Sequence, residues 1–220
     1  MYRFLNSFLN SRYFDRIPTF LAKKIFKIFK IFFVKTNLQN LPENNHPTKI
    51  DKNQLKFINR NEKFYKPFST CLYLLELLAL YHSINKNVKI LDFGANNLDN
   101  YAYLQKNLKN IEYFYHDLPS YNDFIEEFAK KNNLNNIKII KNLSELPNNL
   151  DFVFFGSSIH YVNNYKEILE KITNIKSRYL IFSHTPFYKS NINDKDIVMK
   201  QVNIHPIINY AYLIGYENFI

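Results

Sequence analysis

The chain has 220 residues, 46% of them hydrophobic and 17% aromatic, which is enough for the buried core of one or two domains and argues against disorder. The chain has a single cysteine and no Cys/His pairs at ligand spacing, which excludes a disulfide framework and a zinc site. Its apolar runs are too short for a transmembrane helix. We therefore expect a cytoplasmic protein without a metal. The net charge of +10 lies in residues 1–67, and the excess of Lys over Arg indicates a coding bias, so the charge does not indicate a nucleic-acid partner.

Residues 1–66 are expected to form a basic, aromatic-rich helical arm and linker. Within this arm, Phe20–Val34 (FLAKKIFKIFKIFFV) gathers its lysines on an arc of about 120°, which is typical of a basic amphipathic helix. Such a helix can make a peripheral membrane or partner contact through residues 20–34, or cap a domain core with its lysines in water, and both interpretations are open at this point. Pro42, Pro47 and many Asn indicate a linker in the residues that follow.

Residues 67–220 alternate apolar strands with helices, beginning with a compact apolar helix over 71–82 that is expected to be buried. The predicted strands are 88–93, 112–116, 137–140, 152–155 and 179–182, with helices at 101–109, 121–132 and 165–173. This alternation predicts a doubly wound α/β fold with a mostly parallel, Rossmann-like sheet. Because only about 38 residues follow the last strand, we expect an incomplete C-terminal sheet edge or a truncated chain.

Polar residues follow the predicted strands at their carboxyl ends, which is where open parallel sheets bind ligands. Asp92 lies near the end of the first strand, Asp117 follows the second and Asn142 follows the third. Two of the three glycines, Gly94 and Gly156, also lie there, and glycine permits the tight turn and close backbone approach that a ligand requires. Either glycine alone is equally well a structural turn, but together they favour a ligand site.

Two sequence strings in this region resemble motifs of a known protein family. Residues 90–101, ILDFGANNLDNY, resemble the first motif of class I S-adenosylmethionine-dependent methyltransferases. More narrowly, they are similar to a methyltransferase family, often found with surface-polysaccharide genes, whose first loop reads D-F-G-G-x-x-G-x-x-Y. Residues 152–162, FVFFGSSIHYV, resemble the fourth strand and following turn of that family, and HTPF at 184–187 and Gln201 resemble its later segments. The matching residues are Asp92, Phe93, Gly94 and Tyr101 in the first string, and Ser157, His160 and Tyr161 in the second.

The resemblance implies that S-adenosylmethionine is the cofactor. Gly94, Ala95 and Asn96 would contribute backbone groups near its methionine part, and Asp92 would orient the loop or reach the amino group through water. Asp117 would accept hydrogen bonds from the ribose hydroxyls, unless it is only an acid at a helix start. The remaining implied cofactor contacts are Tyr101, Asn142 at the adenine edge, Gly156 and Ser157.

The first loop departs from the family pattern at Ala95 and Leu98, where the family has glycines. Asn96 or Asn97 can supply a left-handed backbone, because Asn tolerates positive φ better than other non-glycine residues. Leu98 has no such tolerance and is expected to narrow the cofactor pocket or to force a different loop path.

His160, Tyr161 and His184 are the candidate catalytic residues. His160, in the turn after the fourth strand, is expected to act as a general base toward a substrate hydroxyl, or else to be a packing residue at a helix start. Tyr161 shares this turn, and His184 after the fifth strand is the second candidate base. The chain has no phosphate-binding loop, nucleophile elbow or zinc-protease motif, which weighs against phosphotransferase, hydrolase and metalloprotease functions.

The sequence therefore predicts an S-adenosylmethionine-dependent methyltransferase that modifies a hydroxyl of a small molecule or of a sugar or polysaccharide. The alternative is a non-catalytic module that keeps the fold without the cofactor and is anchored to a membrane or partner by residues 20–34. A nucleic-acid methyltransferase ranks third, because no N-P-P-Y or D-P-P-Y element follows the fourth strand.

Overall fold

The computed structural model describes residues 33–42, 72–84, 87–189, 195–201 and 209–218, with residues 18, 21, 24, 25 and 191. The chain divides into two compact units. The parallel-sheet unit contains residues 49–159 and 164–185, and the small-sheet unit contains residues 1–48, 160–163 and 186–220. Most of the predicted amphipathic helix at 20–34 lies outside the described residues. Within the described ranges, no helix has the length and apolar content to cross a membrane.

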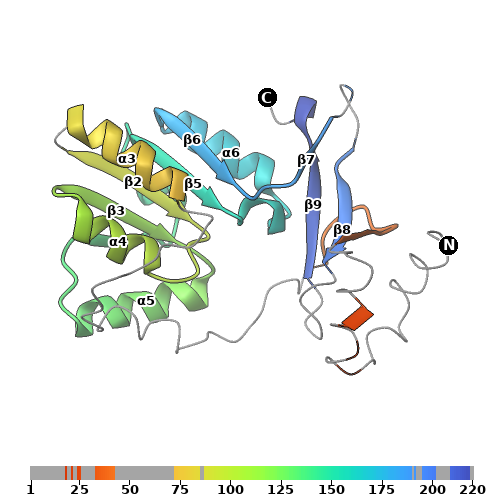
Figure 1. Cartoon of the computed structure of the whole chain (residues 1–220), viewed down its shortest axis with the longest axis horizontal. Helices are drawn as coiled ribbons and strands as arrows, with labels where there is room; N and C mark the ends of the chain where they lie inside the picture. Colours follow the sequence, from red (N-terminus) through yellow and green to blue (C-terminus); the bar gives the residue numbers. More distant parts are fainter. Residues whose placement is uncertain are drawn as a thin grey trace. The chain divides into compact units, whose positions relative to one another are not determined.

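Five parallel strands form the sheet of the parallel-sheet unit (Figure 1). They are β2 (Val88–Phe93), β3 (Ile111–His116), β4 (Ile137–Ile139), β5 (Phe152–Gly156) and β6 (Tyr179–Ser183), in the order β4-β3-β2-β5-β6. Their apolar sequences suit strands that are covered on both faces. All five were predicted from the sequence, and each end lies within one residue of its predicted position.

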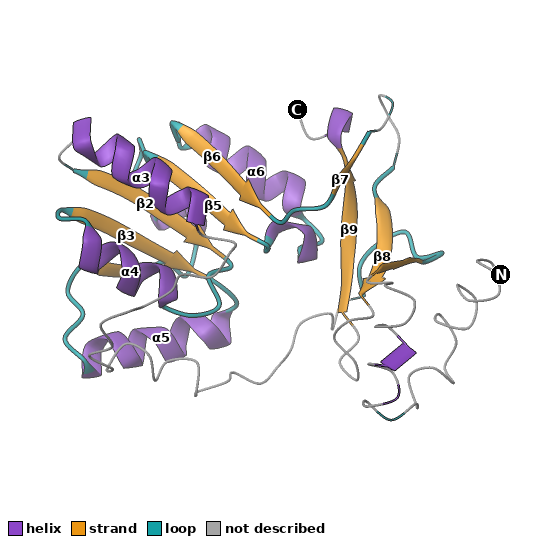
Figure 2. Ribbon diagram, viewed as in Figure 1, coloured by secondary structure: helices purple, strands orange, loops and turns teal. Residues whose placement is uncertain are grey.

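Four α-helices accompany these strands (Figure 2): α3 (Leu72–Ile84), α4 (Asp99–Asn107), α5 (Pro119–Lys131) and α6 (Tyr165–Asn174). The chain steps from β2 to β3 to β4 in one direction and from β5 to β6 in the other. Right-handed crossovers therefore place α4 and α5 on one face and α6 on the opposite face. The predicted doubly wound, Rossmann-like α/β fold class is confirmed.

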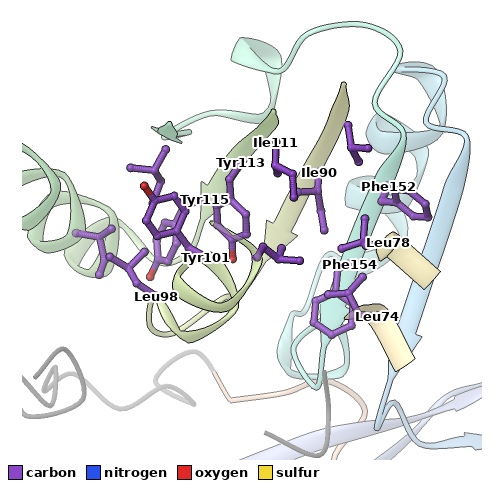
Figure 3. Close-up of a cluster of buried hydrophobic side chains, with 14 of the residues drawn as sticks. Leu74, Leu78, Ile90, Leu98, Tyr101, Ile111, Tyr113, Tyr115, Phe152 and Phe154 are labelled. Atoms are coloured by element: carbon purple, nitrogen blue, oxygen red, sulfur yellow. The ribbon is translucent and has the colours of Figure 1, made fainter. Parts of the chain in front are cut away.

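Alternate strand residues build a core on the face that α3, α4 and α5 cover (Figure 3). Ile90, Tyr113 and Phe154 come from three neighbouring strands and are fully buried. Leu74 and Leu78 of α3 join the same cluster. The prediction that this helix is buried is therefore right for its inward side, whereas other leucines of the helix are exposed.

The small-sheet unit holds a separate sheet in the order β1-β8-β9-β7. Its strands are β1 (Phe33–Lys35), β7 (Phe187–Tyr188), β8 (Ile197–Gln201) and β9 (Asn209–Gly215). Strand β8 is antiparallel to both β1 and β9, and β7 runs parallel to β9. In the described part of the chain, the residues after β6 therefore form this second sheet and do not extend the parallel one.

Two expectations change as a result. Phe33 and Val34 belong to strand β1 and not to the end of a helix, because β1 pairs with β8 and buries Val34. The division into an arm at 1–66 and a domain at 67–220 also differs from the structure, since β8 pairs with β1 and residues 1–48 and 186–220 fall in the same unit. Residue 66 itself lies outside the described residues.

Candidate ligand site at the carboxyl edge of the sheet

From β2 the chain continues to β3 on one side of the sheet, whereas β5 lies on the opposite side of β2 and continues outward to β6. The direction of strand order therefore reverses between β2 and β5. In open parallel sheets this reversal opens a crevice at the carboxyl ends of the two strands, and ligands bind there. Phe93 at the end of β2 is paired with Phe155 near the end of β5, so the loops that follow begin side by side. The candidate site is this edge of the sheet.

Gly94 begins the loop after β2 in a left-handed conformation, with φ of +67°. Its N–H donates to the carbonyl of His116 at 2.7 Å, which ties the loop to the end of β3. A Cβ at this position would overlap the Cβ of Ser158, and the Ser158 hydroxyl donates to the Phe93 carbonyl at 2.6 Å. Glycine is thus required here because two loops meet where a side chain would stand.

The Asp117 carboxylate holds the loop after β2 from the neighbouring strand. Asn96 has φ of +59°, the left-handed conformation that the sequence allowed for it, and its N–H donates to Asp117 Oδ2 at 2.6 Å. Oδ1 of the same carboxylate accepts the N–H of Leu118 at 2.7 Å. Asp117 therefore has both oxygens oriented by backbone donors, and its side chain is partly exposed at the edge of the sheet.

Buried Asn122, in the first turn of α5, fixes the backbone around Asp117. The Asn122 amide accepts the Asp117 N–H at 2.9 Å and donates to the Asp117 carbonyl at 2.8 Å. It also lies 3.3 Å from the carbonyl of Ile140, which follows β4. These bonds join the ends of β3 and β4, so the Asp117 carboxylate is positioned without help from a ligand.

Asp92 lies below the loop and is almost completely buried. Its Oδ2 accepts hydrogen bonds from the Tyr113 hydroxyl and from the Asn100 amide, the latter at 2.8 Å. Burial raises the pKa of this carboxyl to about 6, although the two hydrogen bonds oppose the shift. Because Asn100 belongs to α4, the role that these contacts support is orientation of the loop, one of the two roles expected for Asp92.

Of three other residues of the first motif, one lies in the loop and two lie in the core. Ala95 is partly buried in the loop beside Asn96. Tyr101 lies in the core cluster, where its ring meets that of Tyr113 edge-on at 5.4 Å, so it packs beneath the loop. Leu98, expected to narrow the pocket, is buried in the same core. The start of α4 turns this side chain inward, and its effect on the cofactor pocket and the loop path stays a prediction.

Asn142, Gly156 and Ser157 are accounted for by local structure. Asn142 caps the short helix at Leu143–Glu145: its side chain accepts the Ser144 N–H at 3.1 Å. A Cβ on Gly156 would come within 2.7 Å of the Phe154 ring. Ser157 has φ of +60°, and its N–H donates to the Ser183 carbonyl at 2.8 Å, which links the ends of β5 and β6.

His184 follows β6 directly and is exposed, with φ of +54°. Its Nδ1 lies 3.0 Å from the Ser183 hydroxyl. The structure therefore places His184 at the carboxyl edge of the sheet, at its outermost strand on this side.

His160 and Tyr161 belong to the small-sheet unit. His160 is buried, its Nδ1 has no hydrogen-bond partner in the described part of the chain, and burial lowers its pKa to about 4. The Tyr161 ring lies 4.1 Å from the His160 ring, and its hydroxyl donates to Gln201 Oε1 at 2.9 Å. A histidine with so low a pKa is a weak general base at neutral pH, so the environment of His160 favours packing over catalysis.

The buried imidazole gives a testable pH dependence. The pKa of His160 is about 4 in the folded chain and about 6.5 in the unfolded one, so the unfolded state binds more protons between these values, and stability is lost as pH falls through this window. Relative to His160→Leu, the wild-type chain is expected to lose about 3 kcal/mol of unfolding free energy from pH 7 to pH 4. Urea denaturation at both values measures the difference, and a difference independent of pH would refute the assignment.

Sequence reasoning missed Ser158, Asn100 and Asn122, the side chains that hold the site together. Their partners come from other strands or helices, and no local motif marks such contacts. Within the described residues, no cluster of three or more His, Cys, Asp or Glu is arranged to hold a metal ion.

No family model and no curated protein matches the chain. Solved structures are similar at low identity. A Burkholderia thailandensis 1,6-didemethyltoxoflavin-N1-methyltransferase, with bound 1,6-didemethyltoxoflavin and S-adenosylhomocysteine, is 14% identical with a TM-score of 0.42 over 68% of this chain and 63% of that one. Coclaurine N-methyltransferase, bound to N-methylheliamine and S-adenosylhomocysteine, is 15% identical, with a TM-score of 0.39 over 74% of this chain and 52% of that one. MccD protein is 20% identical, with a TM-score of 0.38 over 56% of this chain and 57% of that one. The chain thus spans about half to three fifths of the length of these structures, and the likeness is one of fold.

Proposed function

We propose that this chain is an S-adenosylmethionine-dependent methyltransferase whose cofactor lies against the loop after β2. The observation that carries the proposal is the carboxylate of Asp117 at the end of β3, beside the Gly94–Asn96 loop and 23 residues after Gly94. In Rossmann-like folds an acid at this place accepts hydrogen bonds from ribose hydroxyls. The motif resemblance of residues 90–101 supports the same cofactor.

The residues present fit a nucleoside cofactor. Each oxygen of the Asp117 carboxylate accepts one backbone N–H, and a carboxylate oxygen can accept more than one hydrogen bond, so this group suits the hydroxyls of a ribose. Leu98 is buried in the core, so its side chain is not exposed on the surface of the loop. S-adenosylmethionine, when bound, supplies an electrophilic methyl group on a sulfonium. The chain's part is to orient the nucleoside through Asp117 and to hold the loop through Asp92 and Asn100.

We propose a hydroxyl of a small molecule or sugar as the methyl acceptor. Displacement at a sulfonium methyl depends mainly on alignment of the reacting atoms, so a strong base is not required. This suits a chain whose His160 is buried and has a depressed pKa. His184 is exposed at the carboxyl edge and is the more accessible group to accept the hydroxyl proton.

The role of Asp117 is tested by equilibrium dialysis with radiolabelled S-adenosylmethionine. We expect Asp117→Ala to weaken binding by about 10- to 100-fold, since hydrogen bonds to a charged group contribute about 1.5–3 kcal/mol. Asp123→Ala is the matched control, because Asp123 is an exposed acid of α5 that pairs with Lys141 at 3.0 Å. The control is expected to bind like wild type, and equal binding by Asp117→Ala would contradict the ribose role.

A further inference from the structure

The apolar surface that stands out in the parallel-sheet unit lies on helix α3. Its sequence, LYLLELLALYHSI, has only three polar residues, and a helix that is apolar on all sides is normally buried on all sides. Leu74 and Leu78 pack into the core, but Leu77, Leu80 and Ile84 are 47%, 66% and 79% exposed. One side of α3 is thus covered by the sheet, and nothing among the described residues covers the other side.

Contacts of α3 show which way the exposed residues face. His82 hydrogen-bonds to the Lys109 carbonyl, next to β3, while the Tyr81 ring meets Tyr179 of β6 at 6.0 Å. At 100° per residue, Leu77 and Ile84 lie about 40–60° further round the helix than Tyr81, on the same side. Leu77 and Ile84 therefore face the β6 edge of the sheet, and Leu80, which is 100° from Tyr81, lies next to them on the side of the helix that points away from the sheet.

Strand β6 is itself an open edge. It pairs with β5 on one side, and no strand among the described residues pairs with its other side. Tyr179 and Leu180 are 48% and 37% exposed there. Because the Tyr179 N–H donates toward β5 to the Asp151 carbonyl, the alternation of a strand directs the Leu180 N–H to the open side. Long apolar edge strands with unpaired donors favour association with another strand.

The size of this surface matches half of a dimer interface. The exposed parts of Leu77, Leu80, Ile84 and Tyr179 amount to about 440 Å², within the range of patches that are often functional, while the Leu180 side chain points to the other face of the sheet. A standard interface buries about 800 Å² per partner, of which roughly 56–65% is apolar. The surface therefore provides the apolar share of one standard interface.

We propose that this surface, made of α3 and the β6 edge, binds a second copy of the same chain. Antiparallel pairing of β6 with the partner's β6, about a two-fold axis normal to the sheet, gives a continuous ten-stranded sheet. The same axis brings the exposed side of α3 against that of the partner, on one face of the sheet. Such a contact is self-complementary and closed, as two-fold homodimers require.

The test is the mass of the full chain in solution, by light scattering after size-exclusion chromatography at about 50 μM. The wild type is expected at about 53 kDa, twice the 26.5 kDa of one chain. Leu80→Lys is expected to run as a monomer, whereas Leu38→Lys, with a 46% exposed leucine of the small-sheet unit, is expected to stay dimeric.

A second variant tests the strand pairing separately. Leu180→Pro removes the outward N–H, and Leu180→Ala, which keeps that N–H, is the control for loss of the leucine side chain. The proline variant is expected to give a monomer with unchanged far-UV circular dichroism, and the alanine variant is expected to stay dimeric. A wild-type monomer would overturn the proposal and indicate that the surface is covered by residues of its own chain. A dimer that survives Leu80→Lys and Leu180→Pro would overturn it as well.

Discussion

Gly94→Ala is expected to lower the unfolding free energy of the parallel-sheet unit by about 2–5 kcal/mol. A positive φ costs an alanine about 1–2 kcal/mol, and the new Cβ would overlap that of Ser158, so the loops after β2 and β5 must separate at a further cost of about 1–3 kcal/mol. Urea denaturation followed by circular dichroism at 222 nm measures the loss, because helices α3 to α6 all belong to this unit.

A double-mutant cycle separates the two causes. Ser158→Gly removes the Cβ that the alanine would meet, so in this background Gly94→Ala should cost only the backbone term of about 1–2 kcal/mol. A cost of less than about 0.5 kcal/mol for Gly94→Ala alone, which is the usual range for a surface substitution, would show that the two loops do not meet as described.

Asp92→Asn is expected to become progressively more stable, relative to wild type, as pH rises from 4 to 7. The pKa of Asp92 is about 6 in the folded chain and about 4 in the unfolded one. Between these values the folded state keeps a proton that the unfolded state has released, so the wild type loses stability as pH rises. A shift of about two pH units corresponds to about 3 kcal/mol, which urea denaturation at pH 4 and pH 7 measures.

Asparagine suits this test because its carbonyl oxygen can still accept from Tyr113 and Asn100. Asp123→Asn is the control, since it makes the same substitution at an exposed carboxylate that pairs with Lys141 on the surface. If the difference between Asp92→Asn and wild type were flat from pH 4 to pH 7, the buried carboxyl would not have the raised pKa that its burial implies.

The parallel sheet was predictable because each strand is a short apolar run bounded by polar residues and followed by a helix. The small sheet was not, because β1 pairs with β8 across more than 160 residues and Phe33–Lys35 looks like the continuation of a helix. Local periodicity cannot reveal a pairing whose partner lies at the other end of the chain.

The candidate site was likewise predictable only in part from the sequence. Asp117 and Gly94 were predictable because topology alone puts strand ends and their glycines at one edge. The inward turn of Leu98 and the support that Asn122 gives to Asp117 depend on how α4 and α5 begin, so they required the structure. His160 shows the opposite case, since its chemistry suggested a base and its burial leaves it uncharged at neutral pH.

The central claim is that the edge formed by Gly94, Asn96 and Asp117 binds S-adenosylmethionine. Its most direct test is calorimetric titration of the full chain with S-adenosylmethionine and S-adenosylhomocysteine, with NAD as the control nucleotide. We expect both sulfur compounds to bind at one site with micromolar affinity and NAD to give no heat. A folded sample that binds neither compound would contradict the claim and would favour a non-catalytic module that keeps the fold without the cofactor.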